Sequence, residues 1–278
     1  MKRYSILALG LGLGLGLGLL SCATPHSGAS AAALTAPAST GRKGVVRGIL
    51  AHNVRLEMDD HGQTRRTASG VVIASDLTPG GWVSYVLTNA HAVDAAEFPG
   101  AKLLALVDEK GSEAKFAATP VAVGVVPEMD LALLRVDGLK GVPASLAEDD
   151  ELEPGESVMV AAAPYGKAVS LSGGLVSQVE LDRKTHAPLM LKTDAPVGYG
   201  ASGGGIYSLA SGHLLAIVEG YRTAKVGFNV GEKGYSFDVP MPGETFAAPT
   251  AKLRSFLTSK GYARLGQPLV ATAVLSAP

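Results

Sequence analysis

The sequence contains 278 residues, of which 47% are hydrophobic, and it carries 24 Lys and Arg residues against 25 Asp and Glu residues. This apolar content excludes an intrinsically disordered chain, and the length suffices for one large or two small domains with a substantial core. The net charge of −1, without a long basic run, argues against nucleic acid as a partner. A single cysteine excludes an intramolecular disulfide framework and a cysteine-based metal cluster. We therefore expect no cofactor and no metal.

Residues 1–21 are predicted to be a secretory signal peptide. Lys2 and Arg3 give a positive start, and residues 6–20 form an uninterrupted run of apolar residues and glycine. This run of about 15 residues is shorter than the roughly 20 that a membrane-spanning helix needs. The run ends in Leu19-Leu20-Ser21-Cys22, which resembles the bacterial lipobox, where the cysteine is lipidated after cleavage. We predict a lipoprotein held at a membrane through Cys22, the alternative being an ordinary secreted protein with one spare thiol.

The residues that follow Cys22 are predicted to form a flexible tether over 22–43, because they are rich in Ala, Ser, Thr, Pro and Gly. Ala23 stands where bacterial lipoproteins retained in the inner membrane often carry aspartate. This resemblance favours an outer-membrane location in the cell envelope.

From Gly44 onward, short runs rich in Val, Leu, Ile and Ala recur about every 8 to 15 residues between turn-forming residues. They form two sets of about six strands, which favours antiparallel barrels or sandwiches. The acidic stretch 148–156 separates the two sets. The strands expected in the first set are residues 45–56, 69–75, 83–88, 102–107, 114–123 and 131–136. Those expected in the second are residues 157–163, 170–178, 188–192, 204–208, 213–219 and 243–247.

One amphipathic helix is expected near the end of the chain. It begins at Thr250, places Leu253, Phe256 and Leu257 on one face, and ends at Gly261. The tail, residues 266–278, shows no usable period.

A candidate nucleophile lies in the glycine-dense segment Gly200-Ala201-Ser202-Gly203-Gly204, which precedes an apolar run. Such a turn can expose a serine beside its own backbone amides. A serine nucleophile needs a base, and His91 alone among the six histidines follows an apolar run at a small-residue turn. Asp130 precedes the apolar run 131–136, where a buried carboxylate needs a partner, although an aspartate before a strand is more often a turn cap. The three residues predict a nucleophile, a base and an orienting carboxylate.

These segments resemble the trypsin-like serine protease superfamily, in particular its bacterial HtrA (Deg) branch, over roughly residues 45–261. The resemblance rests on Ser69-Gly70-Val71-Val72, Leu87-Thr88-Asn89-Ala90-His91, Asp130-Leu131-Ala132-Leu133-Leu134, Ser172-Gly173-Gly174-Leu175-Val176, Thr193-Asp194-Ala195 and the loop around Ser202. It implies an all-β fold of two six-stranded antiparallel β-barrels with a C-terminal helix, over residues 44–148 and 149–265. It also implies a serine endopeptidase acting on polypeptide substrates.

The same resemblance implies the roles of individual residues. Ser202 is expected to attack, His91 to take its proton, and Asp130 to hold the imidazole, while the N–H groups of Gly200 and Ser202 form the oxyanion hole. The substrate pocket is expected to include Pro196, Glu219, Gly220 and Tyr221. Pro196 stands where trypsin-type enzymes carry an acidic residue, so we expect uncharged residues at P1. Glu219 on the pocket wall argues against a preference for glutamate.

The sequence departs from the HtrA pattern at three points. Ala201 replaces the usual Asn or Asp before the serine, Gly205 replaces a common proline, and the approach Val197-Gly198-Tyr199 is unusual. No PDZ-like domain is expected, because the chain ends soon after the helix. The alternative function is a catalytically latent or inactive lipoprotein with this fold that binds extended peptides by strand addition.

Overall fold

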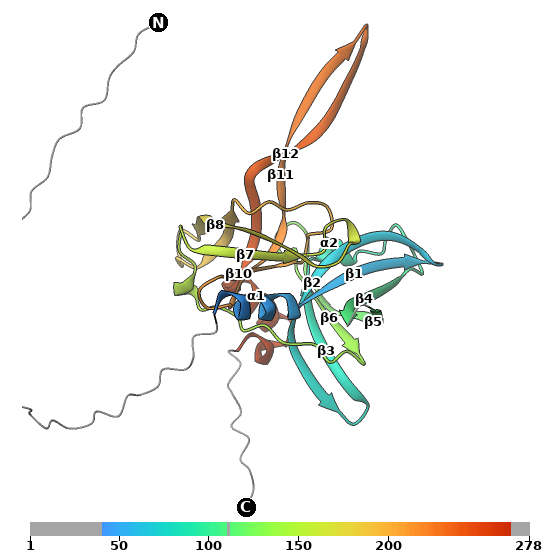
Figure 1. The fold of residues 1–278 in the computed structure, drawn as a ribbon, viewed down its shortest axis with the longest axis vertical. Coiled ribbons are helices and arrows are strands. Elements are labelled where there is room, and N and C mark those ends of the chain that lie inside the picture. The colour runs from blue at the N-terminus through green and yellow to red at the C-terminus, as the bar shows by residue number, and fades with distance from the viewer. Residues whose placement is uncertain (1–40, 110–111, 268–278) are drawn as a thin grey trace, which may run out of the picture. The chain divides into compact units, whose positions relative to one another are not determined.

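Six antiparallel strands close into a first barrel in the spatial order β1-β2-β3-β6-β5-β4 (Figure 1). The computed structural model describes residues 41–109 and 112–267. Fully buried apolar side chains such as Val86, Leu134 and Val136 fill this barrel. Its strands are β1 (Asn53–Asp60), β2 (Gln63–Thr78), β3 (Gly81–Thr88), β4 (Lys102–Glu109), β5 (Ser112–Val123) and β6 (Ala132–Asp137).

Six further antiparallel strands close into a second barrel in the order β10-β11-β12-β9-β8-β7. Val160, Leu191 and Ile206 lie in its core, each at most 1% exposed. The prediction of two six-stranded antiparallel barrels is confirmed. The strands are β7 (Ser157–Ala162), β8 (Ser170–Leu181), β9 (Pro188–Thr193), β10 (Gly205–Ser208), β11 (Leu214–Val230) and β12 (Lys233–Pro249).

The C-terminal helix α3 (Thr250–Ser259) begins at the predicted residue, and Leu253, Phe256 and Leu257 are fully buried. The other helices are α1 (Arg42–Ala51) and α2 (Ala90–Val93), and short 3-10 turns lie at η1 (Asp149–Glu151), η2 (Pro164–Gly166) and η3 (Ala263–Gly266). None of the helices in the described part of the chain is long and apolar enough to cross a membrane. The predicted signal peptide, Cys22, the tether up to residue 40 and residues 268–278 of the tail lie outside the described residues.

The start of the folded chain differs from the prediction. Residues 45–56 were expected to form one strand, but residues 42–51 form helix α1 and strand β1 starts only at Asn53. Val45 and Ile49, four residues apart, lie on one side of the helix and pack into the core that also contains α3. This burial outweighs the preference of valine and isoleucine for strands, because tertiary packing supplies most of the stability of a short helix.

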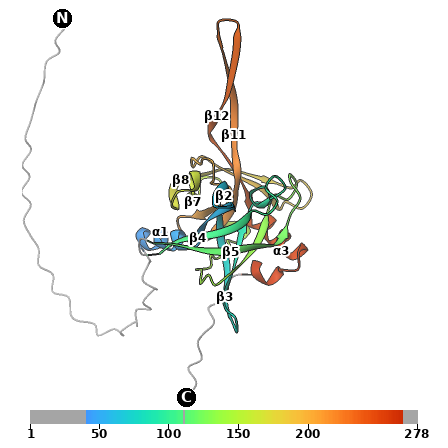
Figure 2. The same cartoon turned by 90° about the vertical axis from the view of Figure 1, so that its right-hand side faces the viewer.

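The last two strands are much longer than predicted. Residues 213–219 and 243–247 were expected to be strands, whereas β11 and β12 each contain 17 residues. The additional residues pair with one another from Thr223↔Pro240 to Val230↔Lys233. They form a two-stranded ribbon that projects from the second barrel (Figures 1 and 2).

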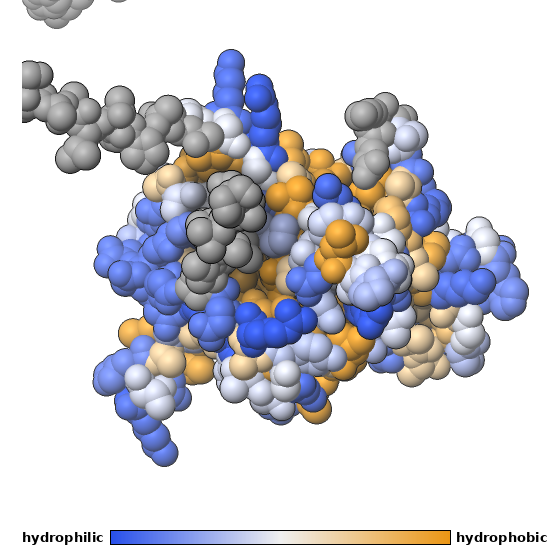
Figure 3. Space-filling model, turned by 90° about the horizontal axis from the view of Figure 1, so that it is seen from below, coloured by the Kyte–Doolittle hydropathy of each residue, from blue (hydrophilic) through white to orange (hydrophobic). Residues whose placement is uncertain are grey.

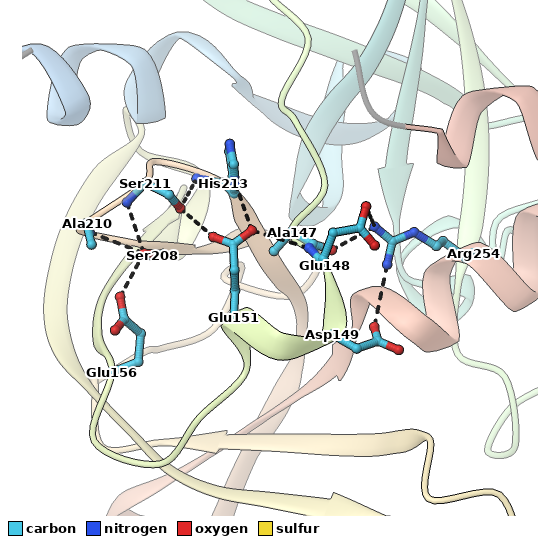
Figure 4. A network of polar contacts seen from close by, with 10 residues as sticks. All are labelled: Ala147, Glu148, Asp149, Glu151, Glu156, Ser208, Ala210, Ser211, His213 and Arg254. Atoms are coloured by element: carbon cyan, nitrogen blue, oxygen red, sulfur yellow. Dashed lines mark hydrogen bonds and ion pairs between the residues drawn. The ribbon is translucent and has the colours of Figure 1, made fainter. Parts of the chain in front are cut away.

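A polar network fastens the segment between the barrels to the second barrel and to α3 (Figure 4). The carboxylate of Glu151 accepts a hydrogen bond from Ser211 Oγ at 2.7 Å and lies 2.8 Å from His213 Nδ1. Arg254 of α3 donates to the Ala147 carbonyl oxygen at 2.7 Å. Burial opposes ionisation of Glu151, but the hydrogen bonds from His213 and Ser211 outweigh it and hold the pKa of this carboxyl below its usual value.

Because the pKa of Glu151 is lowered in the folded protein, its charge stabilises the fold above the pKa of an unfolded glutamate, and this contribution is lost as the pH falls. We expect Glu151→Gln to lower the free energy of unfolding by about 1 kcal/mol at pH 7. The difference from wild type should shrink as the pH falls toward 4 and below. Urea unfolding at both pH values measures it. Glu153→Gln, at an exposed neighbouring position, is the control and should unfold as wild type does.

Candidate active site

His91 and Asp130 lie together at one edge of the first barrel. Strand β3 ends at Thr88, and the single turn α2 carries His91. One oxygen of the Asp130 carboxylate, Oδ1, accepts the backbone N–H of His91 at 2.9 Å, and the other, Oδ2, lies 2.6 Å from His91 Nδ1. In addition, Asn89 Nδ2 donates to the Asp130 carbonyl oxygen at 2.9 Å. The carboxylate therefore fixes both the backbone and the ring of His91, while Nε2 has no partner among the described residues.

Asp130 is a buried carboxylate, 9% exposed, that stays ionised. Burial alone would raise its pKa. The hydrogen bonds from the His91 ring and from the His91 and Ala90 backbone outweigh burial and hold the pKa of Asp130 below its usual value. The negative charge beside Nδ1 favours an imidazole that carries its proton there, which leaves Nε2 as the basic atom.

Ser202 lies in a tight loop before β10. Ala201 N–H donates to the Gly198 carbonyl oxygen at 3.0 Å, and Gly204 N–H donates to the Ala201 carbonyl oxygen at 2.9 Å. Gly200 and Gly203 have φ angles of +86° and +83°, which other residues adopt only under strain. Within the described part of the chain, the N–H groups of Gly200 and Ser202 have no hydrogen-bond acceptor. Both amides are thus available to an oxygen atom outside the protein.

Ser69 of β2 in the first barrel holds this loop of the second barrel. Its hydroxyl donates to the Gly200 carbonyl oxygen at 2.7 Å and accepts the Ala163 N–H at 2.8 Å. The Ser69 N–H donates to the Ser202 carbonyl oxygen at 2.8 Å. Ser69 is completely buried, so neither side-chain bond can be replaced by water at the surface.

We expect Ser69→Ala to lower the free energy of unfolding by about 1–3 kcal/mol, because it leaves a partly buried carbonyl and a buried N–H without their partner. The Gly200 peptide should also become less well positioned. Urea unfolding, together with the rate of labelling of Ser202 by a fluorophosphonate, measures both effects. Ser75→Ala, at a partly buried position farther along the same strand, is the control and should leave the labelling rate unchanged.

His91 and Ser202 line a common cavity of about 410 Å³ between the barrels. No hydrogen bond joins Ser202 to the His91 ring in the described structure. Such bonds are often long before substrate binds. No acidic side chain belongs to the lining, which also contains Arg66, Thr67, Ala68, Ala92, Val197, Gly198, Tyr199, Gly200, Ala201, Val218, Gly220, Tyr221 and Thr223.

The structure brings only two of the four predicted pocket residues into this cavity. Gly220 and Tyr221 line it, but Pro196 and Glu219 do not. Pro196 lines a neighbouring cavity of about 280 Å³. Glu219 instead forms an ion pair with Lys252 of α3, with Oε1 and Nζ 2.9 Å apart. Its charge is therefore neutralised away from the cavity, which removes the argument that it would repel an acidic substrate side chain.

Two features in and beside the cavity were not predicted from the sequence. Arg66 Nη1 donates to the carbonyl oxygens of His91 and Asp94, at 2.9 and 2.7 Å, and so secures the turn that carries His91. The rings of Tyr165, Tyr199 and Tyr221 form a row with centroid distances of 6.3 and 6.1 Å. Partial burial and the neighbouring Tyr199 raise the pKa of Tyr221. The only sequence signal for the row was the unusual Val197-Gly198-Tyr199 approach to the serine.

Comparison with known proteins places this site in a family. The sequence model of the trypsin-like peptidase domain matches residues 68–217, which contain His91, Asp130 and Ser202. The chain is 34% identical over 183 residues to a "probable periplasmic serine endoprotease DegP-like" of Ectopseudomonas mendocina, and the match covers 64% of this chain and 34% of that protein. The chain thus spans about a third of the length of this relative. It belongs to the trypsin-like peptidase family.

Solved structures show the same fold. The crystal structure of Deg5 matches with a TM-score of 0.57 and 20% identity, covering 80% of this chain and 94% of that one. The serine endoprotease from Yersinia pestis matches with a TM-score of 0.56 and 22% identity, covering 84% of this chain and 69% of that one. The two-barrel architecture is therefore the chymotrypsin-like fold of the HtrA proteins.

Proposed function

We propose that this protein is a serine endopeptidase in which Ser202, His91 and Asp130 act as nucleophile, base and orienting carboxylate. The observation that carries the proposal is the double contact between Asp130 and His91, which leaves Nε2 basic within the cavity that Ser202 lines. Family membership supports the same reaction.

In this mechanism, Ser202 Oγ attacks the carbonyl carbon of the scissile peptide while His91 Nε2 takes its proton. The developing oxyanion accepts hydrogen bonds from the free N–H groups of Gly200 and Ser202, and each such donor is typically worth about 10²- to 10³-fold in rate. His91 then gives the proton to the leaving amine. A water molecule hydrolyses the acyl-enzyme by the same steps, again with His91 as the base.

The lining of the cavity supports a preference for uncharged P1 residues. Val197, Val218 and Gly220 are apolar, and no carboxylate is present to bind lysine or arginine. A peptide library should therefore show cleavage after uncharged residues, and a profile dominated by lysine or arginine would contradict this proposal.

We further propose that the mature protein is anchored in the bacterial envelope through lipidated Cys22, with the outer membrane favoured. The lipobox-like segment before Cys22 supports the anchor, and stable attachment requires two or more acyl chains, palmitate among them. The related proteins named as periplasmic agree with an envelope location.

Labelling with a fluorophosphonate tests the catalytic proposal. We expect the purified protein to gain the mass of one probe, the Ser202→Ala variant to gain none, and Ser255→Ala, at an exposed position on α3, to label as wild type does. If the folded wild-type protein does not label, the latent peptide-binding alternative replaces the endopeptidase. The observation that favours this alternative is that no hydrogen bond joins Ser202 to the His91 ring in the described structure.

A further inference from the structure

The ribbon formed by the ends of β11 and β12 has one apolar and one polar face. We call residues 223–230 and 233–240 the arm. In an antiparallel ribbon, directly paired residues point to the same face, and successive pairs alternate between the two faces. Val226 pairs with Phe237, and Phe228 pairs with Tyr235. The apolar face consists of Ala224, Val226, Phe228 and Val230 from β11 and of Tyr235, Phe237 and Val239 from β12, with Lys233 opposite Val230 at its outer end.

The apolar face is ordered but uncovered. The rings of Phe228 and Tyr235 stack with their centroids 5.6 Å apart, and Phe237 meets Phe228 edge-on at 6.2 Å. Even so, Phe228 is 49% exposed and Phe237 is 52% exposed. On the opposite face, Lys225 and Asp238 form an ion pair at 3.5 Å.

The end of the molecule opposite the arm looks different, because hydrophilic side chains lie between its apolar patches (Figure 3). A contiguous exposed apolar surface usually marks an interaction site, and a two-stranded ribbon alone is only marginally stable in water. The face therefore favours a partner that covers it.

The arm continues the wall of the candidate active site. Strand β11 pairs with β10 as far as Ile217, and Val218 exchanges backbone hydrogen bonds with Gly203 and Gly204. Within the described structure, the outer edge of β11 has no strand partner from Glu219 to the tip of the arm. Gly220, Tyr221 and Thr223, on this unpaired stretch, line the cavity that holds Ser202. An extended chain leaving the cavity along this edge would follow β11 to the arm, past the irregularities in pairing between Val218 and Gly220 and between Tyr221 and Thr223.

We propose that the arm is an accessory binding site for unfolded polypeptide substrates whose apolar residues alternate along the chain. The substrate adds as a third strand to the outer edge of β11, and every second side chain covers the apolar face. This inference rests on the proposed endopeptidase function and deepens it.

Other occupants fit the arm less well. About eight residues at roughly 3.4 Å each, across two strands, give a face of about 270 Å², so two arms packed together would bury about 540 Å². A stable dimer needs about 1,200 Å² or more. A membrane-inserting ribbon would carry its apolar residues at the tip, but the tip here is Gly231-Glu232-Lys233-Gly234.

The test compares Phe228→Ser/Phe237→Ser with the control Lys225→Ser/Asp238→Ser, which changes two exposed residues on the opposite face. Substrates are reduced, carboxymethylated α-lactalbumin, which lacks stable structure, and a short chromogenic peptide that fills only the cavity. The apolar-face variant should lower the ratio of kcat/KM for the long substrate to that for the short one by about tenfold. The control should keep the ratio of the wild type, and an unchanged ratio in the apolar-face variant would overturn the proposal.

A binding measurement separates this inference from the catalytic proposal. In the Ser202→Ala background, the dissociation constant of fluorescently labelled α-lactalbumin, reduced and carboxymethylated as above, should rise about tenfold with the apolar-face substitutions. If wild-type protein does not react with fluorophosphonate but this rise is seen, the endopeptidase proposal fails and the arm proposal stands. Equal binding by both variants would overturn the arm proposal. The arm proposal would also be overturned if the protein dimerised or bound vesicles, and if the apolar-face substitutions abolished that association but left polypeptide binding intact. Unchanged thermal unfolding shows that the variants fold.

Discussion

Replacing Asp130 with asparagine is expected to lower kcat/KM for peptide cleavage by about 10³- to 10⁴-fold at neutral pH. Two N–H groups of His91, one on the backbone and one on the ring, use separate oxygens of Asp130. Asparagine offers only one oxygen. When that oxygen faces the backbone N–H, its NH₂ group faces Nδ1, which must then accept. The ring proton moves to Nε2, the atom that has to take the proton of Ser202.

The control for this substitution is Asp137→Asn at the end of β6, the strand that follows Asp130, where the carboxylate is 65% exposed and pairs with Arg135. We expect this variant to cleave as fast as wild type. Because hydrogen bonding lowers the pKa of Asp130, its charge is present throughout the neutral range, and the deficit of Asp130→Asn should persist from pH 6 to pH 8. Steady-state kinetics over that range, with thermal unfolding to show that the variant folds, measure the effect. A kcat/KM within a few-fold of wild type would show that the His91–Asp130 contact does not serve catalysis.

The sequence was sufficient to predict the barrels because most strands are short apolar runs between turn residues. Leu131–Val136 illustrates this, since every residue but Arg135 is buried in the structure. Helix α1 could not be recognised in the same way. Val45 and Ile49 have a high strand propensity. They form a helix because they pack into the core that contains the C-terminal helix, which lies far away in the sequence.

The arm was missed for a different reason. Its strands contain Gly227 and Gly234, which weaken a strand pattern, and its apolar residues are exposed rather than buried. Cross-strand pairing such as Phe228↔Tyr235 stabilises the ribbon, and that pairing depends on a register which no local pattern specifies.

The candidate site was predictable where a residue type must follow a particular element, as for His91 after β3. It was less predictable where side-chain direction matters. Counting back from Ser202 suggested Pro196 for the pocket, and the family resemblance suggested Glu219, but the structure turns Glu219 toward Lys252. Ser69 carried no local signal at all, because its bonds to Gly200 and Ala163 exist only once the two barrels have packed.

At the same interface between the barrels, an added methyl group at Gly203 is expected to lower the stability of the fold strongly. A Cβ atom at Gly203 would overlap the Ser69 carbonyl oxygen and the Thr88 hydroxyl. These two groups are hydrogen-bonded to each other at 2.8 Å and completely buried, so neither can move aside without breaking that bond. The φ angle of +83° adds backbone strain of about 1–3 kcal/mol. We expect Gly203→Ala to lower the free energy of unfolding by about 3 kcal/mol or more.

Gly155→Ala separates the two causes of this loss. Gly155 has a φ angle of +93°, but an added Cβ atom would meet nothing within 4 Å, so its substitution produces backbone strain alone. Urea unfolding of both variants therefore yields the steric cost as the difference between them. If the two variants lose the same stability, the barrels are not packed as closely around Ser69 as the structure shows. If Gly203→Ala loses more, the fraction that still folds must have moved the Ser202 loop away from β2, and its fluorophosphonate labelling should be slower than that of Gly155→Ala.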